Sequence, residues 1–455
     1  MKISPIKYYS TNLRAPEVSF REALLKGLAP DGGLYMPRTI PVLKKSLLNS
    51  FHSLEYYKIA FGILSKFLSS EINDDDLMAL CHDAYYFKIP VERVSGRNFI
   101  LRLDQGPTAS FKDFAARMMA RLMNYFISIE NKHYTVLTAT SGDTGSAVAS
   151  AFHGLKNIEV IILFPSGEVT EIQRKQMTTL HDNIHVIAID GKFDDCQRFV
   201  KRAFSDISLE RISISSANSI NIGRLLPQSV YYFYAWSRVV EKPEDQVIFS
   251  VPSGNYGNLM GGVLAREMGL PVKNFIISSN SNNEVPEYLR TGLYETISPS
   301  INCISSAMNV GHPSNFARLI ALYGGVMNEQ GIILKNPDLE RMRKDFSGFR
   351  VTDEETRETI LTSYKKSGVI LEPHGAVAWK GLESFQNKYH IQNTTDQVFV
   401  SLETAHPAKF PQEISNILGI YPLLPSSLSE LKNKKEEYIE LENDYDKVKE
   451  YILKH

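Results

Sequence analysis

Lys112 is a candidate nucleophile because it stands where a helix is expected to begin. In "PTASFKDFAARMMARLMNYF", residues 107–126, apolar side chains recur every three or four residues, at Phe111, Phe114, Met118, Leu122 and Tyr125. This spacing predicts a helix with one buried face. The positive end of a helix dipole disfavours an ammonium group, so a neutral amine or an imine is favoured at Lys112. Most helical lysines only place their charge in solvent, so this residue needs partners before it identifies a site.

Anion-binding groups are expected in two loops that each join a strand to a helix. "TSGDTG", residues 140–145, offers hydroxyls and free backbone N–H groups, although Ser, Thr and Asp are also the commonest N-caps. "SGNYGN", residues 253–258, contains Gly254 and Gly257, which let the backbone turn its N–H groups onto a phosphate. This second loop lacks the Gly-Lys-Ser/Thr ending of a Walker loop and the glycine spacing of the dinucleotide fingerprint. It therefore indicates a phosphate other than that of ATP or NAD.

Two further polar loops add an arginine and a histidine. "SANSINIGR", residues 216–224, ends in Arg224, which is either a clamp for phosphate or carboxylate or a solvated side chain. "ETAHPAKF", residues 403–410, contains His406, and such a histidine is more often a hydrogen-bonded loop residue than a catalyst. A lysine at a helix start and several anion-binding loops together match the needs of pyridoxal phosphate. That cofactor requires a lysine for its Schiff base, a phosphate seat and a group at its ring nitrogen.

Strands and helices alternate from about residue 98 onward, in a pattern that would bring these loops together. Short β-branched runs such as "YTVLTA", "VIILFP" and "QVIFSVP" are followed by helical stretches such as "SAVASAFHGL", "VTEIQRKQMTTL" and "NLMGGVLAREMGL". This alternation indicates βαβ units and buried parallel sheets. Ligands bind at the carboxyl ends of strands in such sheets, so the loops are expected to share a crevice.

The length of 455 residues suggests two or three domains. Residues 1–97 carry helical patterns and are expected to form a small, mostly helical N-terminal domain. Residues 98–220 are expected to form a first βα domain, and residues 221–425 a second βα domain with the phosphate loop. The charged segment 426–455 repeats apolar side chains every seven residues, at Leu431, Tyr438, Tyr445 and Ile452. This repeat predicts an amphipathic helix packed on the body rather than a partner-binding coiled coil.

The composition excludes several classes of protein. Lys plus Arg is 50 and Asp plus Glu is 51, so the net charge of -1 gives no basic field for nucleic acid. No apolar run approaches the roughly 20 residues of a membrane span, and the start of the chain has no secretory signal, so a soluble protein is expected. Three scattered cysteines form neither a disulfide framework nor a metal-ligand spacing. A cytoplasmic location without a metal site is therefore expected.

Five motifs in register resemble the threonine synthases of the bacterial and fungal type, a family of fold-type II pyridoxal-phosphate enzymes. They are "PTASFKDFAARMMA", "TATSGDTGSAVASAF", "SANSINIGRLLPQ", "SVPSGNYGN" and "TAHPAKF". The opening segment "VSFREALLKGLAPDGGLYMP" also resembles that of the family, so the likeness covers nearly the whole chain. It implies an α/β fold in which two parallel-sheet βα domains flank the cofactor, beside the small N-terminal domain.

The resemblance also implies roles for single residues. Lys112 would form the Schiff base with pyridoxal 5'-phosphate and act as the catalytic base. Thr404 would face the pyridine nitrogen, where a hydroxyl cannot keep the ring protonated as an aspartate would. The cofactor phosphate would be held by the backbone of Ser253, Gly254, Asn255, Tyr256 and Gly257. The phosphate and carboxylate of the substrate would contact Ser141, Thr144, Asn218, Ser219 and Arg224.

Two positions are left open by the resemblance. Asp143 would lie next to the cofactor's phenolic oxygen. A carboxylate there needs a proton or a donor partner to avoid repulsion, and no firm role is implied for this residue. Lys409 is a second candidate for the Schiff base, although a structural role is favoured for it.

The reaction that the resemblance implies converts O-phospho-L-homoserine and water into L-threonine and phosphate, the last step of threonine biosynthesis. Another fold-type II lyase, which releases a keto acid, would keep Lys112 but would not need Arg224 at a second phosphate. A catalytically silent relative would be expected to have lost the lysine or the phosphate loop, and both are present. The chain is expected to act on a small molecule as a monomer or homodimer, without nucleic acid or membrane.

Overall fold

Two parallel β-sheets form the body of the protein in the computed structural model, which describes residues 5–130, 132–242, 245–391 and 397–455. The first sheet has the strand order β15-β7-β6-β5-β8, and all neighbouring strands are parallel. Its strands are β5 (Tyr134–Ala139), β6 (Ile158–Pro165), β7 (Ile184–Asp190), β8 (Ile214–Ser216) and β15 (Ile439–Glu442). The apolar run of β6 is almost wholly buried, as expected for a strand covered on both faces.

The second sheet has the strand order β13-β10-β9-β14-β4-β3, and only the edge pair of β3 and β4 is antiparallel. Its strands are β3 (Val91–Ser95), β4 (Asn98–Arg102), β9 (Val247–Pro252), β10 (Val272–Ser279), β13 (Phe346–Arg350) and β14 (Val398–Glu403). Strands β9 and β14 lie side by side at its centre, so the loops that follow them leave the same edge of the sheet.

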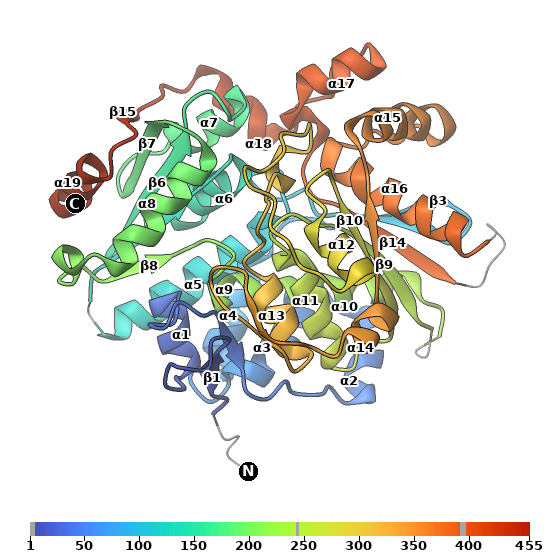
Figure 1. Cartoon of the computed structure of the whole chain (residues 1–455), viewed down its shortest axis with the longest axis horizontal. Helices are drawn as coiled ribbons and strands as arrows, with labels where there is room; N and C mark the ends of the chain where they lie inside the picture. The colour runs from blue at the N-terminus through green and yellow to red at the C-terminus, as the bar shows by residue number, and fades with distance from the viewer. Residues whose placement is uncertain (1–4, 131, 243–244, 392–396) are drawn as a thin grey trace.

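Helices surround each sheet (Figure 1). Around the first sheet lie α5 (Lys112–Glu130), α6 (Asp143–Phe152), α7 (Glu171–Thr178) and α8 (Phe193–Ser205). Around the second lie α10 (Gln228–Val239), α11 (Gly257–Glu267), α12 (Glu284–Thr291), α15 (Asp353–Ser367) and α16 (Pro373–Lys388). This arrangement confirms the predicted α/β class with two parallel sheets.

The N-terminal segment is mostly helical, as predicted, with one small antiparallel pair of strands. Its elements are β1 (Tyr8–Ser10), α1 (Phe20–Lys26), β2 (Tyr35–Pro37), α2 (Lys45–Ser50), α3 (Tyr56–Leu68) and α4 (Asp74–Ala84). Helices α1 and α4 contact α5, and α3 contacts α10, so the segment covers helices of both sheets, as seen at the bottom of Figure 1.

The C-terminal segment differs from the single helix predicted for residues 426–455. It contains the short helix α18 (Ser426–Ser429), strand β15 and helix α19 (Tyr445–Lys454). The prediction was wrong because the edge of the first sheet offers backbone partners to residues 439–442, which pair in parallel with β7. Helix α19 buries its apolar side, where Val448 and Ile452 join the core under the first sheet.

Strand β4 corrects a second assignment. It falls within the region 98–220 predicted as the first βα domain, yet it pairs with β14 of the second sheet. Sequence order could not show this, because β14 comes about 300 residues later in the chain. The domain limits at 97, 220 and 425 otherwise stay a prediction.

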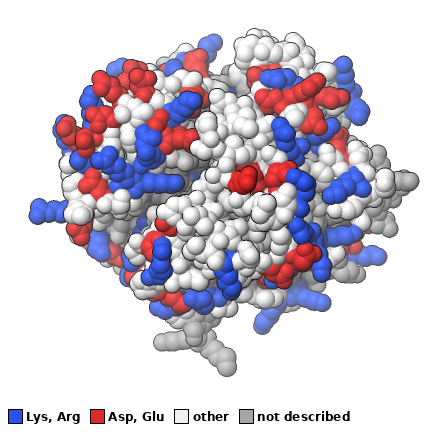
Figure 2. Space-filling view, viewed as in Figure 1, with Lys and Arg blue, Asp and Glu red and all other residues white. Residues whose placement is uncertain are grey.

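No helix in the described part of the chain has both the length and the apolar character needed to cross a membrane. On the face shown in Figure 2, acidic and basic side chains are interspersed. This pattern agrees with the net charge of -1.

Candidate active site

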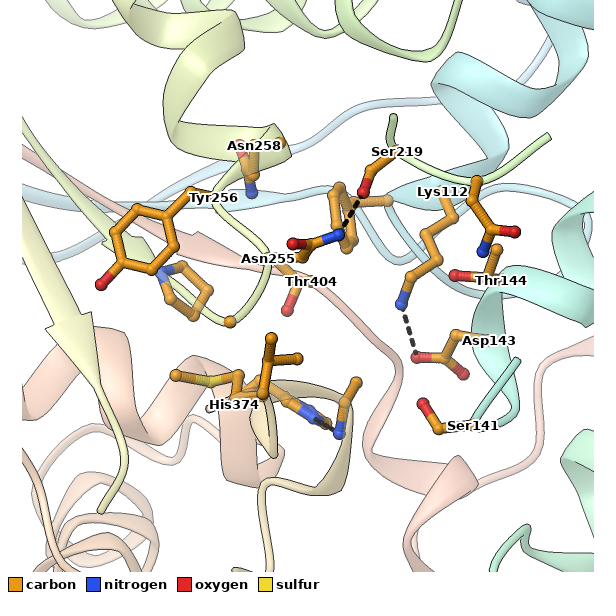
Figure 3. A pocket seen from close by; sticks show the side chains of 18 of the residues that line it. Lys112, Ser141, Asp143, Thr144, Ser219, Asn255, Tyr256, Asn258, His374 and Thr404 are labelled. Atoms are coloured by element: carbon orange, nitrogen blue, oxygen red, sulfur yellow. Dashed lines mark hydrogen bonds and ion pairs between the residues drawn. The ribbon is translucent and has the colours of Figure 1, made fainter. Parts of the chain in front are cut away.

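Lys112 is the first residue of α5, and its side chain lines a pocket between the two sheets. Its Nζ lies 3.7 Å from Oδ2 of Asp143, at the start of α6 (Figure 3). Burial lowers the pKa of Lys112, and although Asp143 opposes this, the nearby cations Lys409 and Arg224 add to it. The helix start predicted from the apolar spacing therefore holds a lysine that loses its proton more easily than usual.

Asp143 has the donor partners that a carboxylate in this place was expected to need. Its Oδ1 lies 2.7 Å from Nζ of Lys409 and accepts a hydrogen bond from Nε2 of Gln173 at 2.9 Å. Burial opposes the charge on Asp143, but Lys409 and Lys112 outweigh burial and hold its pKa below the ordinary value. Lys409 also donates to the carbonyl of Thr108 at 2.9 Å and is fully buried. Its ammonium is thus part of the framework beneath Asp143.

The glycine loop after β9 presents unpaired N–H groups to the pocket. In the part of the chain that the structure describes, the backbone N–H groups of Gly254, Asn255 and Tyr256 have no acceptor. Tyr256 has a left-handed backbone, with φ of 60°, directly before α11 begins. Consecutive N–H groups in such a turn, at the start of a helix, form a seat for an anion.

Asn258, in the first turn of α11, adds a side-chain donor to the same wall. Its Oδ1 accepts hydrogen bonds from the hydroxyls of Tyr231 at 2.6 Å and Tyr232 at 2.8 Å. These bonds fix the amide, and its buried Nδ2 has no partner among the described residues. A buried donor without a partner is costly, which indicates that a ligand completes this place.

Ser253 is placed differently from its neighbours in the loop. Its N–H donates to the carbonyl of Ser278, and its hydroxyl donates to the carbonyl of Val251 at 3.0 Å. Both groups are therefore engaged with the second sheet, and Ser253 is not among the residues that line the pocket. The remaining predicted loop residues, Gly254, Asn255, Tyr256 and Gly257, all line it.

Arg224 offers the pocket a charge that is only partly paired. It lies in the short helix α9 (Ile222–Leu225), is buried, and donates through Nη1 to the carbonyl of Ala217. Its Nε has no partner among the described residues. Burial lowers its pKa to about 10, while Asp113 and Tyr231 partly offset that effect. An arginine in this state is suited to an incoming anion.

The other predicted substrate contacts share this pocket. They are Ser141, Thr144, Asn218 and Ser219. Asn218 donates to the carbonyl of Ala139 at 2.8 Å, and the hydroxyl of Ser219 accepts from Nδ2 of Asn255 at 2.6 Å. The segment 216–224 is held in place by the buried side chain of Arg318, whose guanidinium donates to the carbonyls of Ser219 and Ile220.

Thr404 follows β14 and faces the pocket from the second sheet. Its hydroxyl donates to Oε1 of Glu372, the N-cap of α16, at 3.3 Å. His374, which comes two residues after Glu372 in the chain, lines the pocket beside Thr404 (Figure 3). His406, from the same loop as Thr404, caps the turn at Ala408 instead and does not line the pocket.

Several pocket residues were not predicted from the sequence. They are Phe193, Gln197, Gln228, Asn258, Met308 and His374. The segment "EPHGA", residues 372–376, has the ordinary appearance of a capped helix start with proline in its first turn, so nothing local marked His374 as a pocket residue.

Family models match successive parts of the chain. "Threonine synthase N terminus" matches residues 7–85, "Pyridoxal-phosphate dependent enzyme" residues 88–402, and "Threonine synthase, C-terminal" residues 376–452. Threonine synthase of Haemophilus influenzae is 38% identical over 97% of this chain and 99% of that protein. That of Escherichia coli is 38% identical over 93% of this chain and 94% of that protein.

Solved structures give the same relationship. The threonine synthase structure from Escherichia coli has a TM-score of 0.87 and 36% identity, covering 99% of this chain and 100% of that chain. The PLP-bound threonine synthase from Brucella melitensis has a TM-score of 0.89 and 35% identity, covering 98% of both chains. Similarity of sequence and structure over nearly the full length shows that the chain belongs to the threonine synthase family of pyridoxal-phosphate-dependent enzymes.

Proposed function

We propose that this enzyme converts O-phospho-L-homoserine and water into L-threonine and phosphate. The observation that carries the proposal is a single pocket with a lysine of lowered pKa and two separate places for anions. One place is formed by the unpaired N–H groups of residues 254–256, and the other by the partly unpaired guanidinium of Arg224. A cofactor phosphate and a substrate phosphate require two such places.

The described residues fit pyridoxal phosphate. We assign Lys112 to its covalent attachment, the glycine loop with Asn258 to its phosphate, and Thr404 to its ring nitrogen. The fit rests on the unpartnered Nδ2 of Asn258 and on the unpaired N–H groups of the loop, which an anion would satisfy. When bound, the cofactor supplies an electron sink that makes protons near the amino group of the substrate acidic.

Lys112 is the proposed base for the protons at Cα and Cβ of the substrate. Substrate binding frees its amine, and burial, which lowers its pKa, favours the neutral form that accepts a proton. Lys409 and Lys112 hold the pKa of Asp143 below its ordinary value, which makes this carboxylate a weaker base than usual, so the acceptor role is assigned to Lys112. Lys112 can then return protons to Cγ and Cα.

Arg224 is assigned to the phosphate that leaves from Cγ. Charge develops on that phosphate as its bond to carbon breaks, and a buried guanidinium stabilises the developing charge more strongly than a solvated one. We assign Ser141 and Thr144, at the N-terminus of α6, to the carboxylate of the substrate, because hydroxyls and a helix start suit an anion. Asn218 and Ser219 complete this wall.

The quaternary and cellular setting is also part of the proposal. We propose that the enzyme is a monomer or homodimer in the cytoplasm. Its domains are proposed to meet near residues 97, 220 and 425, with β4 belonging to the second βα domain. The three cysteines of the chain, Cys81, Cys196 and Cys303, are free thiols, which supports a reducing compartment. Size measurement in solution would decide the oligomeric state.

The test of the function is turnover with product analysis. The purified enzyme with pyridoxal phosphate and O-phospho-L-homoserine should release phosphate and L-threonine in equal amounts. A keto acid as the main product would instead identify a lyase of the same fold. Absence of both products, with the cofactor bound, would identify a catalytically silent relative.

A further inference from the structure

The hydroxyl of Ser219 accepts a hydrogen bond but donates none within the described part of the chain. Its Oγ accepts from Nδ2 of Asn255 at 2.6 Å, the bond drawn between these two side chains in Figure 3. The described residues supply no acceptor for the hydrogen of the hydroxyl itself. Because both side chains line the pocket, this hydrogen is available to a ligand that binds there.

The orientation of the Asn255 amide follows from a backbone group. Its Oδ1 accepts from the backbone N–H of Ser314 at 2.6 Å. A backbone N–H can only donate, so the oxygen of the amide must face Ser314 and the nitrogen must face Ser219. The side chain of Asn255 therefore cannot take the hydrogen of the Ser219 hydroxyl, which is left as a donor to the pocket.

Asn315 joins the backbones of the same two loops. It is the N-cap of α13 (Phe316–Leu322) and is fully buried. Its Nδ2 donates to the carbonyl of Ser219 at 3.3 Å and to the carbonyl of Asn255 at 3.0 Å. Its Oδ1 accepts from Nη1 of Arg318 at 2.6 Å. This side chain therefore fixes the backbone of Ser219 relative to that of Asn255.

Arg318 holds the same place from a second direction. Its guanidinium donates to the carbonyls of Ser219 at 3.0 Å, Ile220 at 2.6 Å and Tyr35 of β2 at 3.2 Å. No carboxylate among the described residues pairs with this buried side chain, and burial lowers its pKa to about 9. An unpaired buried charge costs stability, whereas a planar fork holds several carbonyls in one arrangement. Asn315 and Arg318 thus form a rigid frame around Ser219.

The place of Ser219 in the chain indicates which anion its hydroxyl meets. Ser219 and Arg224 lie in the same segment, 216–224, and line the same pocket. Arg224 is assigned to the phosphate of the substrate. The cofactor phosphate already has donors in the N–H groups of the glycine loop and Nδ2 of Asn258, and the substrate carboxylate has the hydroxyls at the start of α6. The free hydrogen of Ser219 is therefore matched to the substrate phosphate.

We propose that Asn255 is a positioning residue that, on the frame of Asn315 and Arg318, makes the hydroxyl of Ser219 a donor to the phosphate of the substrate. The proposal rests on the proposed function and deepens it. The backbone of Asn255 faces the seat of the cofactor phosphate, while its side chain acts on the substrate through Ser219. One residue therefore links the two places for phosphate.

The test is a double-mutant cycle read out as the Kd of inorganic phosphate for the full chain saturated with pyridoxal phosphate. Ser219→Ala should raise this Kd about tenfold, because a hydrogen bond to a charged group is lost. Asn255→Ala should raise it by about threefold or more in the wild-type background. In the Ser219→Ala background Asn255→Ala should cause no further loss, because the hydroxyl through which it acts is gone. Calorimetry of the four proteins measures these values.

Ser141→Ala is the matched control, since it removes another pocket hydroxyl that has no hydrogen bond with Asn255. In that background Asn255→Ala should raise the Kd of phosphate by the same factor as in the wild type. Equal losses from Asn255→Ala with and without the Ser219 hydroxyl would overturn the proposal, because they would show a general effect on the loop.

Ser219→Ala decides the proposal even if Asn255→Ala fails to fold, because an unchanged Kd of phosphate in this variant would overturn it. A weaker affinity of Ser219→Ala for pyridoxal phosphate, with phosphate binding unchanged, would place the hydroxyl at the cofactor instead. Phosphate binding is measured without turnover. A wild-type enzyme that makes a keto acid would therefore contradict the proposed function alone, and an additive cycle in an enzyme that makes threonine would contradict only the role of Asn255.

Discussion

At the scale of single residues, two lysines lie next to the carboxylate of Asp143, and their different surroundings give them different roles. Lys112 lies 3.7 Å from Asp143 and lines the pocket, whereas Lys409 lies 2.7 Å from Asp143 and is fully buried beneath it. An amine that must exchange partners during a reaction needs the open position. The pair therefore combines a reactive lysine with a fixed one that keeps Asp143 charged.

We expect Lys112→Ala to reduce threonine formation by at least about a thousandfold, because attachment of the cofactor and the base are lost together. The cofactor-free variant should be no less stable than the wild type, since alanine suits a first helical turn and burial disfavours the lysine charge. Steady-state kinetics and thermal unfolding measure the two effects. Borohydride reduction followed by peptide mapping should place the cofactor on Lys112, and an adduct on Lys409 would contradict the assignment.

Arg224→Lys should lower turnover of O-phospho-L-homoserine about tenfold to a hundredfold, because a point charge replaces a fork at the leaving phosphate. The absorbance spectrum of the bound cofactor should stay as in the wild type, because its phosphate is assigned to residues 254–258 and not to Arg224. Phosphate release and threonine formation are to be measured together with the spectrum. Kinetics equal to those of the wild type would remove Arg224 from the substrate site.

Glu284, at the start of α12, should make stability depend on pH. Burial raises its pKa from 4.5 to about 7, and its carboxyl oxygens have no hydrogen-bond partner among the described residues. The folded state therefore binds the proton more tightly than the unfolded state, and stability falls as pH rises from about 4.5 to about 7 and levels off above that value.

We expect Glu284→Gln to be close to the wild type near pH 4 and to be more stable by up to about 3 kcal/mol near pH 8. Urea unfolding of both proteins at the two pH values measures this. Glu287→Gln, on the half-exposed side of the same helix, is the control and should show no such change between the two pH values. A constant difference between Glu284→Gln and the wild type at both pH values would contradict the expectation.

At the scale of elements, the glycine loop between β9 and α11 is held closely against the segment before Val310. A Cβ added at Gly254 would lie 2.7 Å from Cα of Met308, whereas one at Gly257 would lie 3.2 Å from the Cβ of Ser219. The first contact, with backbone, is too short and forces a shift, while the second requires Ser219 to move by only a few tenths of an ångström.

Gly254→Ala should therefore weaken binding of pyridoxal phosphate by about 1–3 kcal/mol, roughly fivefold to 150-fold in Kd, because the loop or the facing segment must move. Gly257→Ala should weaken it less. Titration of cofactor-free protein with pyridoxal phosphate, followed by absorbance, compares the two variants with the wild type. An equal loss in both variants, or none in Gly254→Ala, would show that contact with Met308 does not set the shape of the loop.

The elements that could be predicted are those with strong local signals. Strands β5, β6 and β9 are apolar and β-branched runs, and the helices after them carry regular apolar spacing, so each pattern agrees with its fold. The helix predicted from the seven-residue repeat at the C-terminus was wrong, because β15 pairs with β7 at the edge of the first sheet, which is far away in the sequence. For the same reason β4 could not be assigned to its sheet from its position in the chain.

The residues of the candidate site also fall into two groups, those that the sequence marked and those that it did not. The glycine loop and the segments around Lys112 and Arg224 carry unusual residue combinations, and these residues do line one pocket. Glu372, His374 and Asn258 look like ordinary helix-start residues, since capping uses the same polar side chains as ligand binding. Their contacts with Thr404, Ala307 and the two tyrosines exist only in three dimensions.

At the scale of the whole molecule, the pocket is assembled from both sheets. Ser141 and Asp143 follow β5 of the first sheet, while Gly254 and Thr404 follow β9 and β14 of the second. Lys112 starts the helix α5, which follows β4 of the second sheet and packs along α6 beside the first. Because a bound cofactor would touch groups from both sheets, it should stabilise their relative position as well as each part.

Removal of pyridoxal phosphate should therefore lower the unfolding temperature of the whole chain. At a free cofactor concentration of 100 times Kd, binding to the folded state alone adds about 2.7 kcal/mol. Calorimetry of cofactor-free and loaded protein measures the change, and hydrogen exchange should show protection in both 140–145 and 253–258 on loading. Lys112→Ala should gain less stability from the same concentration, because covalent attachment is lost while the phosphate seat remains. Protection confined to 253–258 would mean that the cofactor contacts only the second sheet, and the assignment of Asp143 and its loop to the cofactor would then be wrong.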